Sequence, residues 1–85
     1  MSKEVAFKNV ERYIQLSEAI SSLRKENGLS QYALAEGADI SRSLLRKIEA
    51  PGVIKTFSIE VFYNISDILK IPPEDLMAIS NINYK

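Results

Sequence analysis

Hydrophobic residues recur at spacings of three and four along most of the chain, which is typical of helices with one buried face. In the first third of the sequence these positions are Val10, Tyr13, Ile14, Leu16, Ile20 and Leu23. They predict a helix from about Asn9 to Asn27, which Gly28 then ends, because glycine readily adopts the left-handed conformation of helix ends. No stretch alternates as a half-buried strand does. The pattern therefore predicts an all-α protein.

Two serines mark the start of two short helices in the middle of the chain. Ser30 precedes a helix over residues 31–37, and Ser41 precedes a helix over residues 42–49. Serine is a good residue for these positions, because its hydroxyl oxygen accepts a hydrogen bond from a backbone N–H of the first turn. Only residues 38–40 connect the two helices, so the pair must cross steeply. We therefore expect a helix-turn-helix over residues 30–49.

Two further helices are predicted in the C-terminal half. The segment Ala50-Pro51-Gly52 ends the preceding helix, because proline cannot continue it, and a loop follows. Ser58 begins a fourth helix that extends to about residue 69, with a broad apolar stripe formed by Ile59, Phe62, Ile65, Ile68 and Leu69. After Pro72, residues 73–77 form a last short helix with acidic residues in its first turn.

Length and composition fit one soluble domain. The chain has 85 residues, of which 46% are apolar and 26% are charged, as in ordinary globular proteins. It has no cysteine, no apolar run near the ~20 residues of a membrane span and no apolar core of a signal peptide at its N-terminus. We therefore expect residues 1–85 to form a single cytoplasmic domain that spans no membrane.

The residue types that serve catalysis and metal binding are scarce. The sequence contains no histidine, no cysteine and no glycine-rich phosphate loop. Glu74 and Asp75 are adjacent carboxylates, but neighbours on a helix point apart, and the helix dipole explains their place in a first turn. We therefore expect no enzymatic activity, no metal site and no cofactor.

The charges are unevenly distributed although the formal net charge is zero. Residues 41–55 carry four bases and one acid, a local charge of +3, whereas the segments before and after carry −1 and −2. The four bases are Arg42, Arg46, Lys47 and Lys55. A local positive face on a neutral protein favours DNA binding that depends on a docked shape more than on bulk attraction.

Several groups of residues carry a resemblance to a known family. In chain order they are Leu23-Arg24-Lys25-Glu26-Asn27-Gly28-Leu29-Ser30-Gln31, Leu34-Ala35-Glu36, Ile40-Ser41-Arg42-Ser43, Ile48-Glu49, and Ser58-Ile59-Glu60 with Leu69, Ile71, Glu74 and Leu76. Over residues 15–77 the chain resembles the Cro-like phage repressors and XRE-type helix-turn-helix regulators. Residues 1–14 would then be an N-terminal arm or an extended first helix, and residues 78–85 a short tail.

This resemblance implies a fold and a function. The fold is a compact five-helix, lambda-repressor-like DNA-binding domain with its helix-turn-helix at helices two and three. The function is that of a transcriptional regulator, a repressor, which binds a palindromic operator in double-stranded DNA through the major groove as a homodimer. Base contacts are implied for Arg42, Ser43, Leu44 and Lys47.

The spacing of apolar residues indicates which side of the helix over residues 42–49 is buried. Ala35 must be small because this helix crosses it closely, while Leu45 and Ile48 hold the helix to the core. We expect the other positions to face outward, where long donors can bridge guanine acceptors and an apolar group can meet a thymine methyl. The outward set is Arg42, Ser43, Leu44, Arg46 and Lys47.

Contacts to phosphate and to a second subunit are predicted elsewhere. Gln31 begins the helix over residues 31–37, where its side-chain amide and the free backbone N–H groups can hold a phosphate oxygen. Weaker candidates for phosphate contact are Tyr32, Arg46 and Lys55. The candidate dimer surfaces are the N-terminal arm with Phe7 and the C-terminal helix with Leu76, Met77, Ile79 and Ile82.

Some positions depart from the family pattern and favour a second interpretation. Asp39 stands at the turn position that glycine usually holds in the family. Gly37 weakens the helix over residues 31–37, and the loop over residues 50–57 is longer than the usual loop of the family. The alternative is an antitoxin or regulatory interaction module on the same scaffold, with a protein or peptide as partner. The neutral net charge, Asp39 and an outward Leu44 support it.

Overall fold

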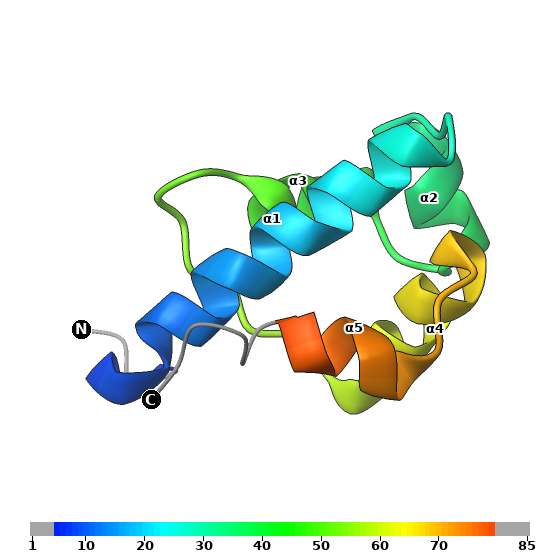
Figure 1. Cartoon of the computed structure of the whole chain (residues 1–85). Helices are drawn as coiled ribbons and strands as arrows, with labels where there is room; N and C mark the ends of the chain where they lie inside the picture. The colour runs from blue at the N-terminus through cyan, green and yellow to red at the C-terminus, as the bar shows by residue number, and fades with distance from the viewer. Residues whose placement is uncertain (1–4, 80–85) are drawn as a thin grey trace.

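The computed structural model describes residues 5–79, and every regular element in this range is helical (Figure 1). The elements are a 3-10 turn η1 (Phe7–Asn9) and the helices α1 (Val10–Glu26), α2 (Gln31–Gly37), α3 (Arg42–Glu49), α4 (Ile59–Leu69) and α5 (Pro73–Ile79). The predicted all-α, five-helix fold with a helix-turn-helix at helices two and three is confirmed. Helix α1 agrees with its predicted bounds within one residue at each end, η1 precedes it as a separate turn, and α5 extends to Ile79, beyond the predicted residues 73–77.

Three serines cap the helices as the sequence predicts. The hydroxyls of Ser30, Ser41 and Ser58 accept hydrogen bonds from backbone N–H groups of α2, α3 and α4 at 3.0, 3.0 and 3.1 Å. Each serine has an extended backbone, so that the helix begins at the next residue. Because these bonds join residues three apart, the starts of the helices are determined by the local sequence.

Three helices end in the same way. After α1, α2 and α4 the chain passes through one residue in the left-handed conformation, with φ of +70° at Gly28, +60° at Asp39 and +61° at Lys70. The N–H of the next residue then donates to a carbonyl five residues earlier, as from Ile40 to Ala35 at 3.0 Å. The left-handed Asp39 agrees with its place at a turn. Lys70 was not anticipated, because no residue type there signals this conformation.

The core lies where the five helices meet. Its buried apolar side chains are Leu16, Ile20, Leu34, Ala35, Ala38, Leu45, Ile48, Phe62, Ile65, Leu69 and Leu76. Helix α1 is the long helix of the molecule, and α3 and α5 both pack against it, while α4 packs against α2 and α5 (Figure 1). The prediction that Ala35, Leu45 and Ile48 hold the helix pair to the core is confirmed, because all three side chains are buried.

Two features of the packing differ from the sequence predictions. Leu76 is fully buried within the chain, so its assignment to a dimer surface is wrong. A Cβ atom at Gly37 would lie 3.0 Å from Cδ1 of Ile68, so this glycine permits the close approach of α4 rather than only weakening α2. Both residues therefore serve contacts between helices.

Residues 5–79 contain neither a candidate membrane-spanning helix nor a cluster of metal ligands. None of the helices in this part of the chain is both long and apolar enough to cross a membrane. The same residues contain no group of three or more carboxylate, histidine or cysteine side chains placed to hold a metal ion.

Candidate nucleic-acid interface

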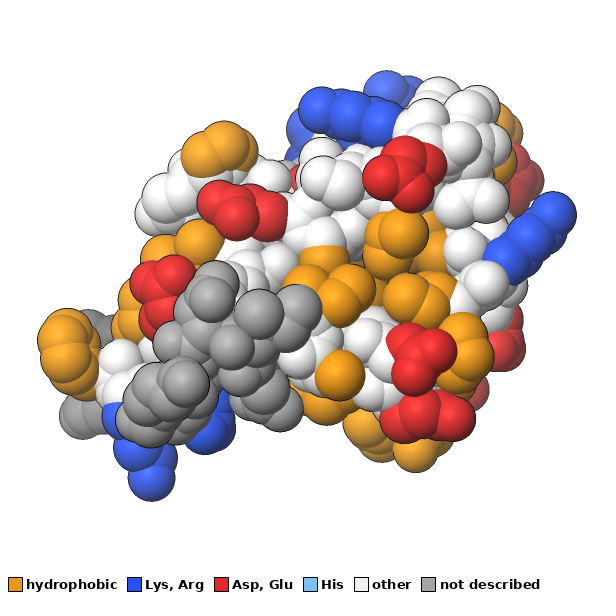
Figure 2. All heavy atoms as spheres, in the orientation of Figure 1, with side chains coloured by type: hydrophobic (Ala, Val, Ile, Leu, Met, Phe, Trp, Pro, Cys, Tyr) orange, Lys and Arg blue, Asp and Glu red, His pale blue; other side chains and the backbone are white. Residues whose placement is uncertain are grey.

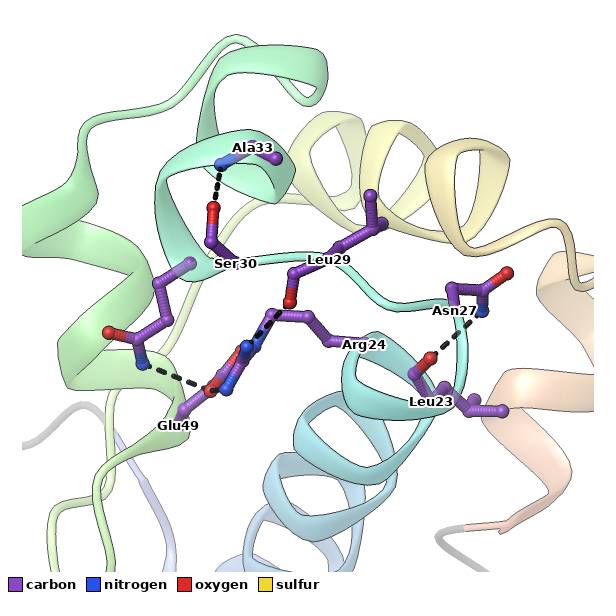
Figure 3. A network of polar contacts seen from close by, with 8 residues as sticks. Leu23, Arg24, Asn27, Leu29, Ser30, Ala33 and Glu49 are labelled. Atoms are coloured by element: carbon purple, nitrogen blue, oxygen red, sulfur yellow. Dashed lines mark hydrogen bonds and ion pairs between the residues drawn. The ribbon is translucent and has the colours of Figure 1, made fainter.

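A buried ion pair connects the ends of three helices. The Arg24 Nε donates to Oε2 of Glu49 at 2.9 Å, and another guanidinium nitrogen donates to Oε1 at 3.1 Å (Figure 3). The Gln31 amide nitrogen also donates to Oε1 of Glu49, at 3.0 Å. The exposed fractions of the Arg24 and Glu49 side chains are 11% and 4%. The network thus joins the last turn of α1, the first residue of α2 and the last residue of α3.

The same arginine also fixes the connection between α1 and α2. Its remaining terminal nitrogen donates to the Leu29 carbonyl at 2.8 Å, in the loop that precedes the Ser30 cap (Figure 3). Two parallel bonds to one carboxylate give this pair a defined geometry, which single contacts lack. The orientation of α3 relative to α2 therefore depends on one buried carboxylate at the end of α3.

Sequence analysis missed this network, although one signal was present. Glu49 lies four residues after Leu45 and next to Ile48, which places its side chain toward the buried face of α3. A carboxylate on a buried face requires a partner. The pattern gave no means of choosing Arg24, which is 25 residues away.

Helix α3 presents a polar and basic surface to solvent. Arg42, Ser43, Arg46 and Lys47 are all exposed, as predicted, while Leu45 and Ile48 are buried on the opposite side. Two of these charges also stabilise α3 itself, because Arg46 and Lys47 lie in its last turn, where positive charges interact favourably with the helix dipole. Three long cationic side chains therefore emerge from one eight-residue helix.

The outward position predicted for Leu44 is wrong. Leu44 is half-buried and packs against the core. It lies four residues before Ile48, so the two share a side of the helix, and the apolar stripe of α3 is wider than Leu45 and Ile48 alone suggest. The set of exposed candidates for base contact is thus Arg42, Ser43 and Lys47.

The phosphate candidates fall in different environments. Gln31 is half-buried and bonded to Glu49, so part of its hydrogen-bonding capacity is already used inside the protein. Lys55 is half-buried in the loop between α3 and α4, and Arg46 is exposed on α3. Figure 2 shows Lys and Arg side chains at the upper edge, at the right edge and at the lower left of the view, with Asp and Glu side chains spread over the face toward the viewer.

Tyr32 lies beside the first residue of α3. Its side chain is 55% exposed, and the Arg42 guanidinium carbon lies 5.8 Å from the centre of its ring. A hydrogen bond to Glu36, together with the charge of that carboxylate, raises the pKa of the Tyr32 hydroxyl. These residues and Asp39 line a surface pocket of about 320 Å³ between α2 and α3.

The candidate dimer residues are also dispersed. Phe7 is 94% exposed and Met77 is 40% exposed, whereas Ile79 is half-buried and packs against the core. Ile82 lies outside the described residues. Met77 lines a pocket of about 350 Å³ at the N-terminal half of α1, whose apolar walls include Tyr13, Phe57 and Ile59.

The fold and the exposed α3 surface define a class of protein. Two serine-capped helices joined by a short turn, the second with a buried apolar side and an exposed basic side, are the arrangement of a helix-turn-helix DNA-binding domain. Residues 17–82 match the helix-turn-helix domain family, and the chain belongs to that family. A comparison with curated proteins found no match.

The family match supports a DNA-binding regulator and is consistent with the resemblance noted in the sequence. It confirms the helix-turn-helix domain as such. The finer assignment to Cro-like or XRE-type regulators stays a prediction, as do repression and dimerisation.

Proposed function

We propose that the protein is a sequence-specific, Cro-like or XRE-type transcriptional repressor that binds a palindromic operator in double-stranded DNA as a homodimer. The observation that carries the proposal is the exposed surface of α3, on which Arg42, Ser43 and Lys47 stand together. A helix of this kind fits the major groove, which is ~12 Å wide, and its arginine and lysine can bridge guanine acceptors. The proposal involves neither catalysis nor a cofactor.

The Arg24–Glu49–Gln31 network supports the proposal by fixing how α3 is presented. Base recognition requires side chains held within a fraction of an ångström of their hydrogen-bonding positions. Glu49 at the end of α3 is bonded to α1 and α2, and these bonds oppose rotation of α3 away from the domain. Phosphate contacts by Arg46 and by the start of α2 would then set the register on DNA. Base contacts by the other exposed residues of α3 would read the sequence.

Selection of bound duplexes from a random pool, followed by sequencing, tests the proposal. We expect a two-fold symmetric consensus with half-sites about one DNA turn apart, ~34 Å. Titration of the selected and of scrambled duplexes then gives the specificity. The proposal fails if no duplex binds below ~10 µM at low salt, where non-specific binding normally appears.

The exposed apolar side chains favour a second candidate function, that of an antitoxin or regulatory module that binds a protein or peptide. Phe7, Ile59, Tyr63 and Met77 are between 40% and 94% exposed. Under this alternative the domain would bind DNA weakly or without sequence preference, so the same titration distinguishes the two functions.

A further inference from the structure

The contact between Tyr32 and Arg42 joins the two helices of the helix-turn-helix at the surface. Tyr32 is the second residue of α2, and Arg42 is the first residue of α3. Their separation of 5.8 Å between guanidinium carbon and ring centre is within the ~6 Å range of cation–π attraction. The sequence prediction assigned Tyr32 a phosphate contact, whereas its ring in fact faces an arginine that is itself a candidate for base contact.

The tyrosine ring belongs to a helix that is itself joined to α3. Gln31, the residue before Tyr32, donates a hydrogen bond to Glu49 at the end of α3. Glu36 lies one turn further along α2, and its carboxylate raises the pKa of the Tyr32 hydroxyl. Because the ring faces Arg42 from this helix, it can limit the orientations open to the Arg42 side chain.

Carboxylates on the same side make phosphate an unfavourable partner for Arg42. Glu36 and Asp39 line the pocket that Tyr32 and Arg42 also line. Negative charges there repel a phosphate oxygen, whereas the neutral edge of a base pair is repelled far less. The arrangement thus favours contact between Arg42 and a base over contact with the DNA backbone.

We propose that Tyr32 is a positioning residue for Arg42, which holds the guanidinium so that its donors select guanine at one base pair of each half-site. A cation–π contact uses none of the guanidinium N–H donors, so they stay available for two hydrogen bonds to guanine. An arginine side chain has large rotamer entropy, and holding it in place before binding reduces the entropy lost on binding. The inference rests on the proposed DNA-binding function.

Base preferences of four single variants test this role. Tyr32→Phe keeps the ring, Tyr32→Leu removes it, Arg42→Ala removes the guanidinium, and Tyr63→Leu removes an equally exposed tyrosine on α4 as a control. Each variant is subjected to duplex selection and to titration with the selected operator and its single-base substitutions. Circular dichroism verifies that each variant folds, which we expect because both tyrosines are about half exposed.

We expect Tyr32→Leu to reduce discrimination about two- to five-fold at the same base pair that Arg42→Ala affects, as an exposed cation–π contact would. Tyr32→Phe and Tyr63→Leu should keep the wild-type preference at that base pair. Adding Tyr32→Leu to Arg42→Ala should cause no further loss there, because the tyrosine acts through the arginine.

Other outcomes overturn the inference and are distinguishable from failure of the proposed function. If Tyr32→Leu weakens binding equally on all duplexes, Tyr32 contacts phosphate and does not position Arg42. If Tyr32→Leu binds with unchanged preference, the contact has no role in recognition. Absence of any duplex binding by the wild-type chain overturns the proposed function itself, and the positioning role with it.

Discussion

At the scale of single residues, two left-handed positions with side chains bear on both stability and function. A side chain in this conformation costs about 1–2 kcal/mol, less for aspartate, and glycine avoids the cost. Asp39 connects α2 to α3 and lines the pocket beside Arg42, whereas Lys70 follows α4. The two residues therefore have the same backbone conformation in different parts of the molecule, and each is the control for the other.

We predict that Asp39→Gly and Lys70→Gly both raise the free energy of unfolding, by up to about 1 kcal/mol, with the larger gain at Lys70. Only Asp39→Gly should also tighten DNA binding, because it removes a negative charge next to Arg42. Urea denaturation measures the first effect and titration at fixed salt the second. Equal effects of both variants on DNA binding would contradict the placement of Asp39 at the interface.

At the scale of elements, one carboxylate at the end of α3 links this helix to two others. Glu49 accepts hydrogen bonds from Arg24 and Gln31, and its side chain is almost fully buried. Removing one member of a buried ion pair leaves the other charge without compensation, which is more costly than replacing both by apolar residues. The position of α3 should thus depend on the pair as a unit.

We predict that Glu49→Gln lowers the free energy of unfolding by about 2 kcal/mol, because Arg24 keeps its charge in a largely buried place. The double variant Arg24→Met/Glu49→Leu should recover most of that stability. Chemical denaturation of Arg24→Met, Glu49→Leu and the double variant measures the coupling between the two substitutions. Additive effects of the two substitutions would mean that the ion pair makes no specific contribution.

The exposed basic residues of α3 should contribute to DNA binding in two ways, by contacting bases or by contacting phosphates. We predict that Arg42→Ala or Lys47→Ala costs roughly 1–3 kcal/mol of binding free energy and relaxes the preference at particular base pairs. Arg46→Ala should weaken binding on every sequence and reduce the slope of log K against log salt by about 1. Titrations at several salt concentrations with operator and scrambled duplexes separate the two effects, and a uniform loss for Lys47→Ala would assign it to phosphate.

At the scale of the whole molecule, a formal net charge of zero coexists with a basic helix near the middle of the chain and with exposed apolar residues such as Phe7 and Met77 far from it in sequence. A domain of 85 residues obtains roughly 3–5 kcal/mol from one core, so association with a second copy would add stability as well as a second DNA-contacting helix. The pocket beside Met77, whose lining includes Tyr13, Phe57 and Ile59, is a candidate surface for that association.

We predict that Met77→Lys weakens dimer formation and operator binding together, because a charge at an apolar interface is not compensated. Val53→Lys is the control, since Val53 is exposed to a similar degree, 45% against 40%, in the loop after α3. Sedimentation equilibrium with and without operator measures association. A wild-type chain that is monomeric at tens of micromolar, even on operator DNA, would contradict the dimer.

Much of the fold follows from interactions between residues close in sequence. The serine caps join residues three apart, the helix ends are closed by bonds over five residues, and apolar spacing selects the buried side of each helix. For this reason the bounds of α2, α3 and α4, the all-α class and the exposed basic side of α3 could all be predicted from the sequence.

What the sequence did not determine depends on how the helices are placed in three dimensions. The Arg24–Glu49 pair, the approach of Gly37 to Ile68, the burial of Leu44 and Leu76 and the contact of Tyr32 with Arg42 all require packing between elements. Local propensities carry no information on which partner a side chain meets at a separation of 25 residues. The sequence alone therefore determined a helix-turn-helix whose helix α3 is basic, and the tertiary structure decided which of its side chains are buried, which are paired and which are exposed.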